Sequence, residues 1–184
     1  MAAPLDGAAR AAVADIVATV RAAVKPEREV RWVRLDGLHV TLRFVGPTDP
    51  DRIVRIEEAA EAAARDAAAF SVTLEGAGAF PAQGRPRAIW IGLTDGAEAL
   101  QQLAVNLDDE LADRGWPRSE RPFRPHLTLA RSDGVAAGAA TVAALSEAVM
   151  GRTITSRIDR IVVFETITGG GPARYIERAS APLG

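Results

Sequence analysis

The sequence contains no cysteine in its 184 residues. This absence excludes disulfide bonds, thiolate nucleophiles and zinc sites held by cysteine. The chain also has no run of about 18 apolar residues, the length that a membrane-spanning helix requires. Its first residues lack the basic and apolar regions of a signal peptide. We therefore expect a cytoplasmic protein that has no contact with a membrane.

The chain has little excess charge of either sign. It carries 22 Lys and Arg against 24 Asp and Glu, a formal net charge of −2. Proteins that coat long nucleic acids are usually basic, so a nucleic-acid end or a small nucleotide is a better candidate ligand. The length and the hydrophobic fraction of 48% predict one domain, or one domain of two lobes, with a substantial core.

Histidine is scarce too, and its two occurrences share one pattern. Residues 39–42 read His-Val-Thr-Leu, and residues 126–129 read His-Leu-Thr-Leu. Histidine is the only side chain whose unperturbed pKa allows proton exchange near neutral pH. The general acid/base groups of the chain therefore lie in two matching places.

Both patterns alternate as half-buried strands do. His39 and Thr41 then share one face, about 6.6 Å apart along the strand, and His126 and Thr128 repeat this arrangement. Alternation also places Arg43 on the face of His39, where it either meets a phosphate or is solvated.

Two imidazoles and two hydroxyls that converge suit in-line displacement at phosphorus. One His accepts a proton, the other donates one, and Thr41 and Thr128 hold the phosphate oxygens. Two His without cysteine or a carboxylate at ligand spacing make a poor metal site. We expect catalysis by His39 and His126 without a metal or organic cofactor.

These motifs and their flanks resemble the two-histidine phosphoesterase superfamily, most closely its RNA 2′,3′-cyclic phosphodiesterase branch, historically called the 2′-5′ RNA ligase family. The similar segments are residues 31–46, 78–92 and 123–131, followed by Tyr175, and the resemblance runs from about residue 5 almost to the end.

The resemblance implies further roles in the site. It implies the acid role for His39 and the base role for His126, although the symmetric motif alone leaves the two roles open. It implies a substrate contact for Arg131, which strict alternation places away from His126 unless the strand ends or bulges. Phe44 points to the core by alternation, whereas the resemblance suggests an aromatic residue near a base. Phe80, Trp90 and Tyr175 are further stacking candidates, with a core role as the alternative.

The order of the expected elements indicates an α+β fold built by duplication. Two lobes with antiparallel-rich sheets would enclose a central groove, with helices outside and pseudo-repeat halves of roughly 1–86 and 87–184. Family members usually begin with a short strand, which we expect to be missing here because residues 1–4 lead almost directly into helix-like sequence. The expected helices cover 5–24, about 49–67, 95–115 and 133–151, and the expected strands 31–34, 39–44, 70–77, 87–93, 153–165, 173–179 and one from 126.

The expected function is hydrolysis of RNA or nucleoside 2′,3′-cyclic phosphate ends to 2′-phosphomonoesters by a monomeric enzyme, with reversible 2′-5′ RNA ligation as a further reaction of the same groups. One alternative is a phosphodiesterase for a small cyclic nucleotide or ADP-ribose cyclic phosphate. Another is a non-catalytic module that binds RNA ends. A wide groove lined with arginine would favour RNA, and a closed pocket would favour the small substrate.

Overall fold

A computed structural model describes residues 1–24, 29–169 and 172–184. The helices are α1 (Gly7–Ala23), α2 (Ile53–Arg65), α3 (Ala97–Asp113) and α4 (Val135–Val149), with short 3₁₀ turns at η2 (Leu35–Gly37) and η3 (Pro50–Arg52). The strands are β1 (Ala2–Pro4), β2 (Val30–Trp32), β3 (His39–Thr41), β4 (Phe70–Phe80), β5 (Ala88–Leu93), β6 (His126–Ser132), β7 (Ile154–Ile158), β8 (Arg160–Ile167) and β9 (Arg174–Pro182). The predicted turn between the last two strands includes residues 170–171, which lie outside the described residues.

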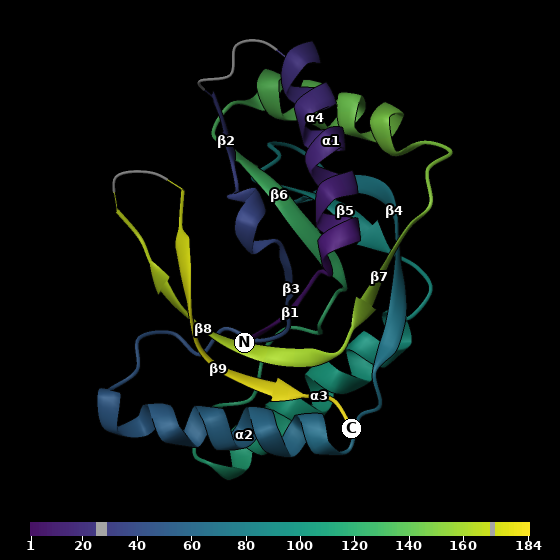
Figure 1. The fold of residues 1–184 in the computed structure, drawn as a ribbon. Coiled ribbons are helices and arrows are strands. Elements are labelled where there is room, and N and C mark those ends of the chain that lie inside the picture. The colour runs from purple at the N-terminus through teal and green to yellow at the C-terminus, as the bar shows by residue number, and fades with distance from the viewer. Residues whose placement is uncertain (25–28, 170–171) are drawn as a thin grey trace.

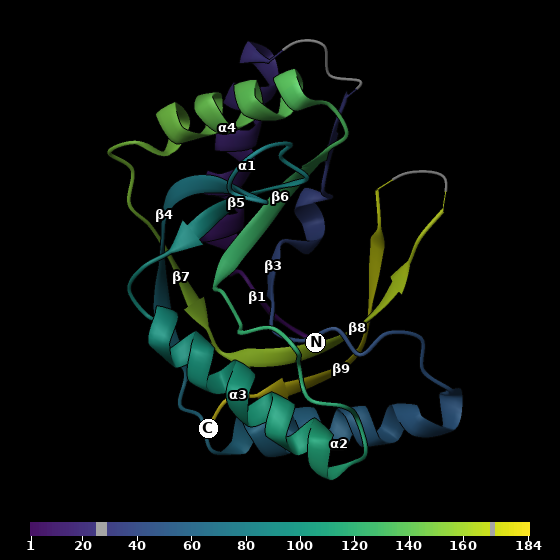
Figure 2. The same ribbon diagram turned by 180° about the vertical axis from the view of Figure 1, so that it is seen from behind.

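The strands form two antiparallel sheets. One has the order β3-β1-β8-β9, and the other has the order β2-β6-β5-β4-β7. Helices α2 and α3 cover the first sheet, and α1 and α4 pack at the opposite end of the molecule (Figures 1 and 2). This arrangement confirms the predicted α+β fold with helices outside two antiparallel sheets.

The strand expected to be missing at the N-terminus is present. Ala2 pairs with Thr41 in β3 and with Val162 in β8, so β1 lies between these two strands. The prediction was wrong because three residues are too few to show a period, and because Ala2 and Ala3 are both buried. The strand β1 stands beside β3 as β5 stands beside β6, which gives each histidine strand a neighbour.

A second correction concerns the predicted strand over residues 153–165. The chain turns at Asp159 and forms two strands, β7 and β8, which belong to different sheets. Apolar residues are frequent on both sides of Asp159, so the pattern alone suggested one continuous element. The break lets the C-terminal part of the chain complete the sheet that contains the first histidine.

The end of β1 is fixed to the rest of the fold by Asp6. One carboxylate oxygen of Asp6 accepts a hydrogen bond from the backbone N–H of Ala9 at 2.8 Å and caps α1. The other oxygen accepts from the backbone N–H of Arg157 in β7 at 2.8 Å. These bonds hold the pKa of Asp6 below its ordinary value, the N–H of Ala9 making the largest contribution.

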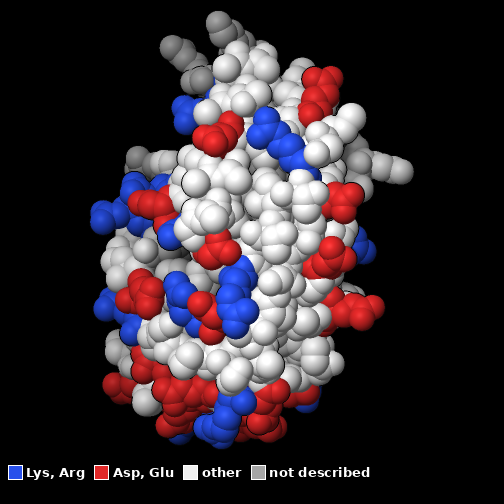
Figure 3. Space-filling view, turned by 45° about the vertical axis from the view of Figure 1, so that its right-hand side comes forward, with Lys and Arg blue, Asp and Glu red and all other residues white. Residues whose placement is uncertain are grey.

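Charge is unevenly distributed over the surface. Acidic side chains gather at the base of the molecule in Figure 3, where α2 and α3 lie. The acidic residues of α2 and α3 are Glu57, Glu58, Glu61, Glu98, Asp108, Asp109, Glu110 and Asp113. None of the helices in the described part of the chain combines the length and hydrophobicity that a transmembrane helix needs.

Candidate active site

The first histidine lies on β3 at the junction of the two sheets. Val40 is completely buried, whereas His39 and Thr41 are half-buried on the opposite face of the strand, as the alternation predicted. Nδ1 of His39 lies 2.7 Å from the carbonyl oxygen of Gly37. A carbonyl oxygen only accepts hydrogen bonds, so Nδ1 carries the hydrogen and Nε2 is left available for chemistry.

The second histidine has the same environment on β6. Leu127 is fully buried, and His126 and Thr128 are half-buried on the other face. Nδ1 of His126 lies 2.6 Å from the carbonyl oxygen of Arg124, again two residues earlier in the chain. The strands β3 and β6 contact each other. The fold therefore places two imidazoles with the same tautomer on neighbouring strands from different sheets.

Each imidazole packs against two aromatic rings. His39 contacts Tyr175, with ring centroids 4.6 Å apart, and Phe164, with ring centroids 5.2 Å apart. His126 contacts Phe80 at 5.0 Å and Trp90 at 6.3 Å. Such contacts restrict the rotation of the imidazoles. The sequence identified three of these rings as candidates but missed Phe164, whose only signal was its place in an apolar run.

The two phenylalanines occupy matching positions in the two sheets. Phe80 lies two residues beyond Gly78, which pairs with β5, and Phe164 lies two residues beyond Val162, which pairs with β1. Position 78 requires glycine for a steric reason, because a Cβ atom there would lie 2.5 Å from the ring of Trp90. The indole therefore covers the backbone of β4 beside His126.

Burial affects the protonation of His39. Desolvation lowers the pKa of His39 below its ordinary value of 6.5, and the hydrogen bond to the carbonyl of Gly37 opposes this shift only in part. At neutral pH His39 is thus held in its neutral form. A neutral imidazole with a free Nε2 is prepared to accept a proton.

Arg131 lies on the same face of β6 as the catalytic candidates because the strand bulges. Trp90 of β5 pairs with Thr128 of β6. Ala88, two residues before Trp90, pairs with Arg131, which lies three residues after Thr128. The extra residue lies within Leu129–Ala130, both fully buried. Arg131 is therefore exposed on the face of Thr128, contrary to strict alternation, through the bulge that a substrate contact would require.

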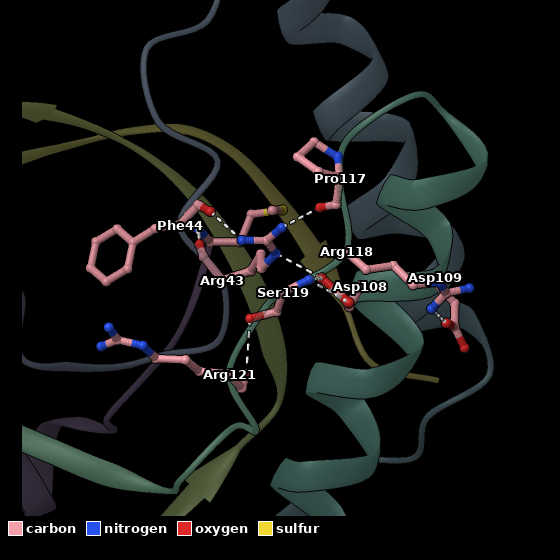
Figure 4. Close-up of polar contacts among 9 residues, drawn as sticks. Arg43, Phe44, Asp108, Asp109, Pro117, Arg118, Ser119 and Arg121 are labelled. Atoms are coloured by element: carbon pink, nitrogen blue, oxygen red, sulfur yellow. Dashed lines mark hydrogen bonds and ion pairs between the residues drawn. The ribbon is translucent and has the colours of Figure 1, made fainter.

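Arg43 is engaged in a network of contacts with α3 and with the loop before β6. The strand β3 ends at Thr41, so alternation does not extend to residue 43. Nε of Arg43 contacts Asp108 at 2.7 Å, and Nη2 contacts the carbonyl oxygen of Pro117 at 2.5 Å (Figure 4). Asp108 also accepts from the backbone N–H of Ser119 at 3.0 Å. Arg43 therefore ties α3 to the loop that leads into β6.

Phe44 is not a core residue, contrary to the alternation. Its side chain is 67% exposed, because the regular strand has ended three residues earlier. The phenyl ring of Phe44 and the guanidinium of Arg121 both point away from the Arg43 network and toward the same side (Figure 4). The two side chains come from the loops that follow β3 and precede β6, so both stand near the ends of the histidine strands.

Two hollows lie near these strands. One, of about 350 Å³, is lined by the His39 neighbours Phe164 and Tyr175 and by exposed charged residues. The other, of about 300 Å³, contains Arg131. Among the described residues, no group of three or more His, Asp and Glu side chains is arranged to hold a metal ion.

The fold and the paired His-x-Thr strands are those expected of the family that the two motifs resemble. A sequence model of the 2′-5′ RNA ligase superfamily matches residues 7–170, and the chain belongs to this family.

Curated relatives of the chain are RNA 2′,3′-cyclic phosphodiesterases. The protein of Methanothermobacter thermautotrophicus is 33% identical over 134 residues, 73% of this chain and 70% of the relative. The protein of Archaeoglobus fulgidus is 34% identical over 124 residues, 64% of this chain and 68% of the relative. A Geobacillus stearothermophilus relative is 36% identical over 100 residues, which are 54% of this chain and only 32% of that longer protein.

Solved structures share the fold over nearly the whole chain. LigT of Escherichia coli, crystallised with 3′-AMP, is 26% identical, has a TM-score of 0.72, and is matched over 99% of this chain and 95% of LigT. A protein of Thermus thermophilus has a TM-score of 0.78 at 23% identity, over 99% of this chain and 95% of that protein, which shows the fold alone.

Proposed function

We propose that this protein opens the 2′,3′-cyclic phosphate at the end of an RNA with water and leaves a 2′-phosphomonoester. The observation that carries the proposal is the matched pair of imidazoles. Each donates through Nδ1 to the carbonyl two residues earlier, and each keeps Nε2 free. The names of the curated relatives support the same reaction.

The chemistry requires one proton acceptor and one proton donor. A water oxygen attacks phosphorus while a neutral imidazole removes its proton. The bond between phosphorus and O3′ breaks, and a protonated imidazole donates its proton to O3′. Thr41 and Thr128 each offer a hydroxyl to the non-bridging oxygens. Arg131 lies farther along the same face of β6, where its positive charge attracts the substrate polyanion.

The burial of His39 bears on which histidine has which role. The resemblance implies that His39 is the acid and His126 the base. In the free protein, however, desolvation lowers the pKa of His39 and favours its neutral form, which is the form that removes a proton from water. The neutral form of His39 supports the base role for this residue, opposite to the role that the resemblance implies, and the symmetric motif allows both assignments. Ligation of a cyclic end uses a 5′-hydroxyl in place of water as the nucleophile, so the base again removes the proton of the nucleophile and the acid again protonates O3′.

RNA ends are the substrate class that we favour over small cyclic nucleotides. The hollow of about 300 Å³ that contains Arg131 is lined by exposed arginines, as a groove for a polyanion would be. LigT, a relative in fold, was crystallised with 3′-AMP and with NADP⁺. By the same likeness we propose a phosphate-bearing nucleotide as the ligand of this protein.

The test of this proposal is hydrolysis of a short RNA with a 2′,3′-cyclic phosphate end, with EDTA present, at pH 5 to 9. We expect turnover with a bell-shaped pH profile and a 2′-phosphomonoester product. Binding without turnover would replace the proposal with an RNA-end-binding module. Activity that EDTA abolishes would show that a metal takes part, and preference for ADP-ribose cyclic phosphate would favour the small substrate.

A further inference from the structure

A cluster of four arginines lines the hollow of about 300 Å³ at the far end of β6. Its lining consists of Arg31, Arg85, Arg87, Arg131, Ser132 and Asp133. Arg31 contacts Asp133 at 2.9 Å across the surface. Within residues 1–24, 29–169 and 172–184, no ion pair engages the other three arginines. The hollow therefore has a local excess of three positive charges in a chain whose net charge is −2.

The arrangement of these arginines is unfavourable for the fold alone. Arg31 in β2 lies directly opposite Arg131 in β6, and like charges in facing positions of antiparallel strands destabilise the pair. Arg87 joins them because the backbone N–H of Ser132 donates to its carbonyl oxygen at 3.0 Å. An anion in the hollow would offset this repulsion.

The hollow continues the face that carries the catalytic groups. The bulge in β6 puts Arg131 on the face of His126 and Thr128, and Arg31 shares that face as the direct partner of Arg131. His126 pairs with Gly92 and Arg131 pairs with Ala88. The two partners on β5 are four positions apart, which is about 13 Å along the strand. A phosphate held between the histidines therefore leaves the arginines without a phosphate of their own.

We propose that the hollow lined by Arg31, Arg85, Arg87 and Arg131 binds a backbone phosphodiester of the RNA, upstream of the cyclic phosphate at the histidines. This inference rests on the proposed function, which it refines. A nucleoside 2′,3′-cyclic phosphate has one phosphate and cannot fill both positions, whereas an oligonucleotide fills both. The arginines thus select RNA ends over mononucleotides.

The test compares two substrates, a nucleoside 2′,3′-cyclic phosphate and a five-nucleotide RNA with the same end. The variant Arg85→Gln/Arg87→Gln removes two charges that have no ion pair among the described residues. We expect the ratio of kcat/KM for the RNA to kcat/KM for the mononucleotide to fall by about tenfold or more, the effect of one or two lost charge-assisted hydrogen bonds. The control Arg21→Gln/Arg55→Gln makes the same charge change on exposed helix positions and leaves the ratio unchanged.

A binding measurement separates this inference from the proposed reaction. Fluorescence anisotropy follows a five-nucleotide RNA with a 2′-phosphate end as the salt concentration rises. For each lost phosphate contact, we expect the salt slope of log K to become shallower by about 0.7 in the double variant. If the wild type turns over no cyclic phosphate, the reaction fails, and a shallower slope still supports the arginine site.

Two results would overturn the inference. The first is a double variant that hydrolyses both substrates with the wild-type ratio and binds RNA with the wild-type salt slope. The second is a loss on ADP-ribose cyclic phosphate equal to the loss on RNA, which would assign the hollow to a pyrophosphate instead of an RNA phosphodiester.

Discussion

The imidazole of His39 and the ring of Tyr175 form a T-shaped contact, with centroids 4.6 Å apart and ring planes at 86°. Tyr175 comes from β9, at the opposite edge of the sheet from β3. The contact therefore depends on the curvature of the whole sheet. With the bond from Nδ1 to the carbonyl of Gly37, it fixes both the tautomer and the direction of Nε2.

Removing the ring of Tyr175 should reduce kcat more than it changes KM. In Tyr175→Ala the imidazole of His39 loses one of its two aromatic neighbours, and we expect kcat to fall by about tenfold through misorientation. Tyr175→Phe keeps the ring and should retain near wild-type kcat. An increase in KM with unchanged kcat would show instead that Tyr175 binds the substrate.

The burial of His39 predicts its titration. Its pKa in the folded chain lies below the 6.5 of an unperturbed histidine, so ¹³C-edited NMR should show one imidazole with a midpoint below that value. The chain has only two histidines, and His126→Ala assigns the signals. A His39 midpoint above 6.5 would contradict the desolvation argument and remove its support for His39 as the base.

The same shift affects stability in a defined direction. Because the folded pKa is lowered, the unfolded chain binds the proton more readily, and acid favours unfolding. The stabilisation that neutral His39 contributes is complete above pH 6.5 and is lost as the pH falls below that value toward the folded pKa. We expect His39→Gln to flatten the pH dependence of the urea midpoint in this range. An unchanged dependence would attribute the acid sensitivity to other groups.

Asp108 should matter for stability far more than its neighbour Asp109. Asp108→Ala leaves Arg43, which is only 16% exposed, without its ion pair and removes the acceptor for Ser119. We expect the free energy of unfolding to fall by about 2–3 kcal/mol. Asp109 pairs with Arg118 at the surface, so Asp109→Ala should cost less than about 1 kcal/mol. Equal urea midpoints for the two variants would show that the Arg43 network does not stabilise the fold.

Asp6 should stabilise the folded state through the cap of α1 and through its hydrogen bond to β7. We expect Asp6→Ala to lower the free energy of unfolding by about 1–2 kcal/mol. Asp15→Ala, on the exposed side of the same helix, is the matched control and should be close to neutral. Because the pKa of Asp6 is lowered, its contribution is present above pH 3.8 and lost as the pH falls through the folded pKa. Two variants of equal stability would contradict this role.

The sequence allowed a good prediction of the histidine strands because their signals are local. His39 and Thr41 alternate with apolar residues that are buried in the structure. Both histidines repeat one motif, and Nδ1 of each bonds a carbonyl two residues away. Such an arrangement needs no knowledge of distant contacts. The resemblance to the family added the substrate class on the same residues.

The features that the sequence did not predict depend on pairing between distant segments. The strand β1 is defined by Thr41 and Val162, its partners far along the chain. The bulge that turns Arg131 to the face of His126 and Thr128 exists only relative to β5. Phe164 reaches His39 through the order of the sheet. The sequence contains all of these residues, but it does not specify how the distant strands pair.

We expect His39 and His126 to act together as one acid/base pair. This expectation is tested most directly by kcat/KM for a 2′,3′-cyclic phosphate RNA end in the wild type, His39→Ala, His126→Ala and the double variant, with EDTA present. We expect kcat/KM to fall by about 10²–10⁴-fold in each single variant. The double variant should be little worse than either, as for groups that act as a unit. A single variant that keeps wild-type kcat/KM would contradict this expectation.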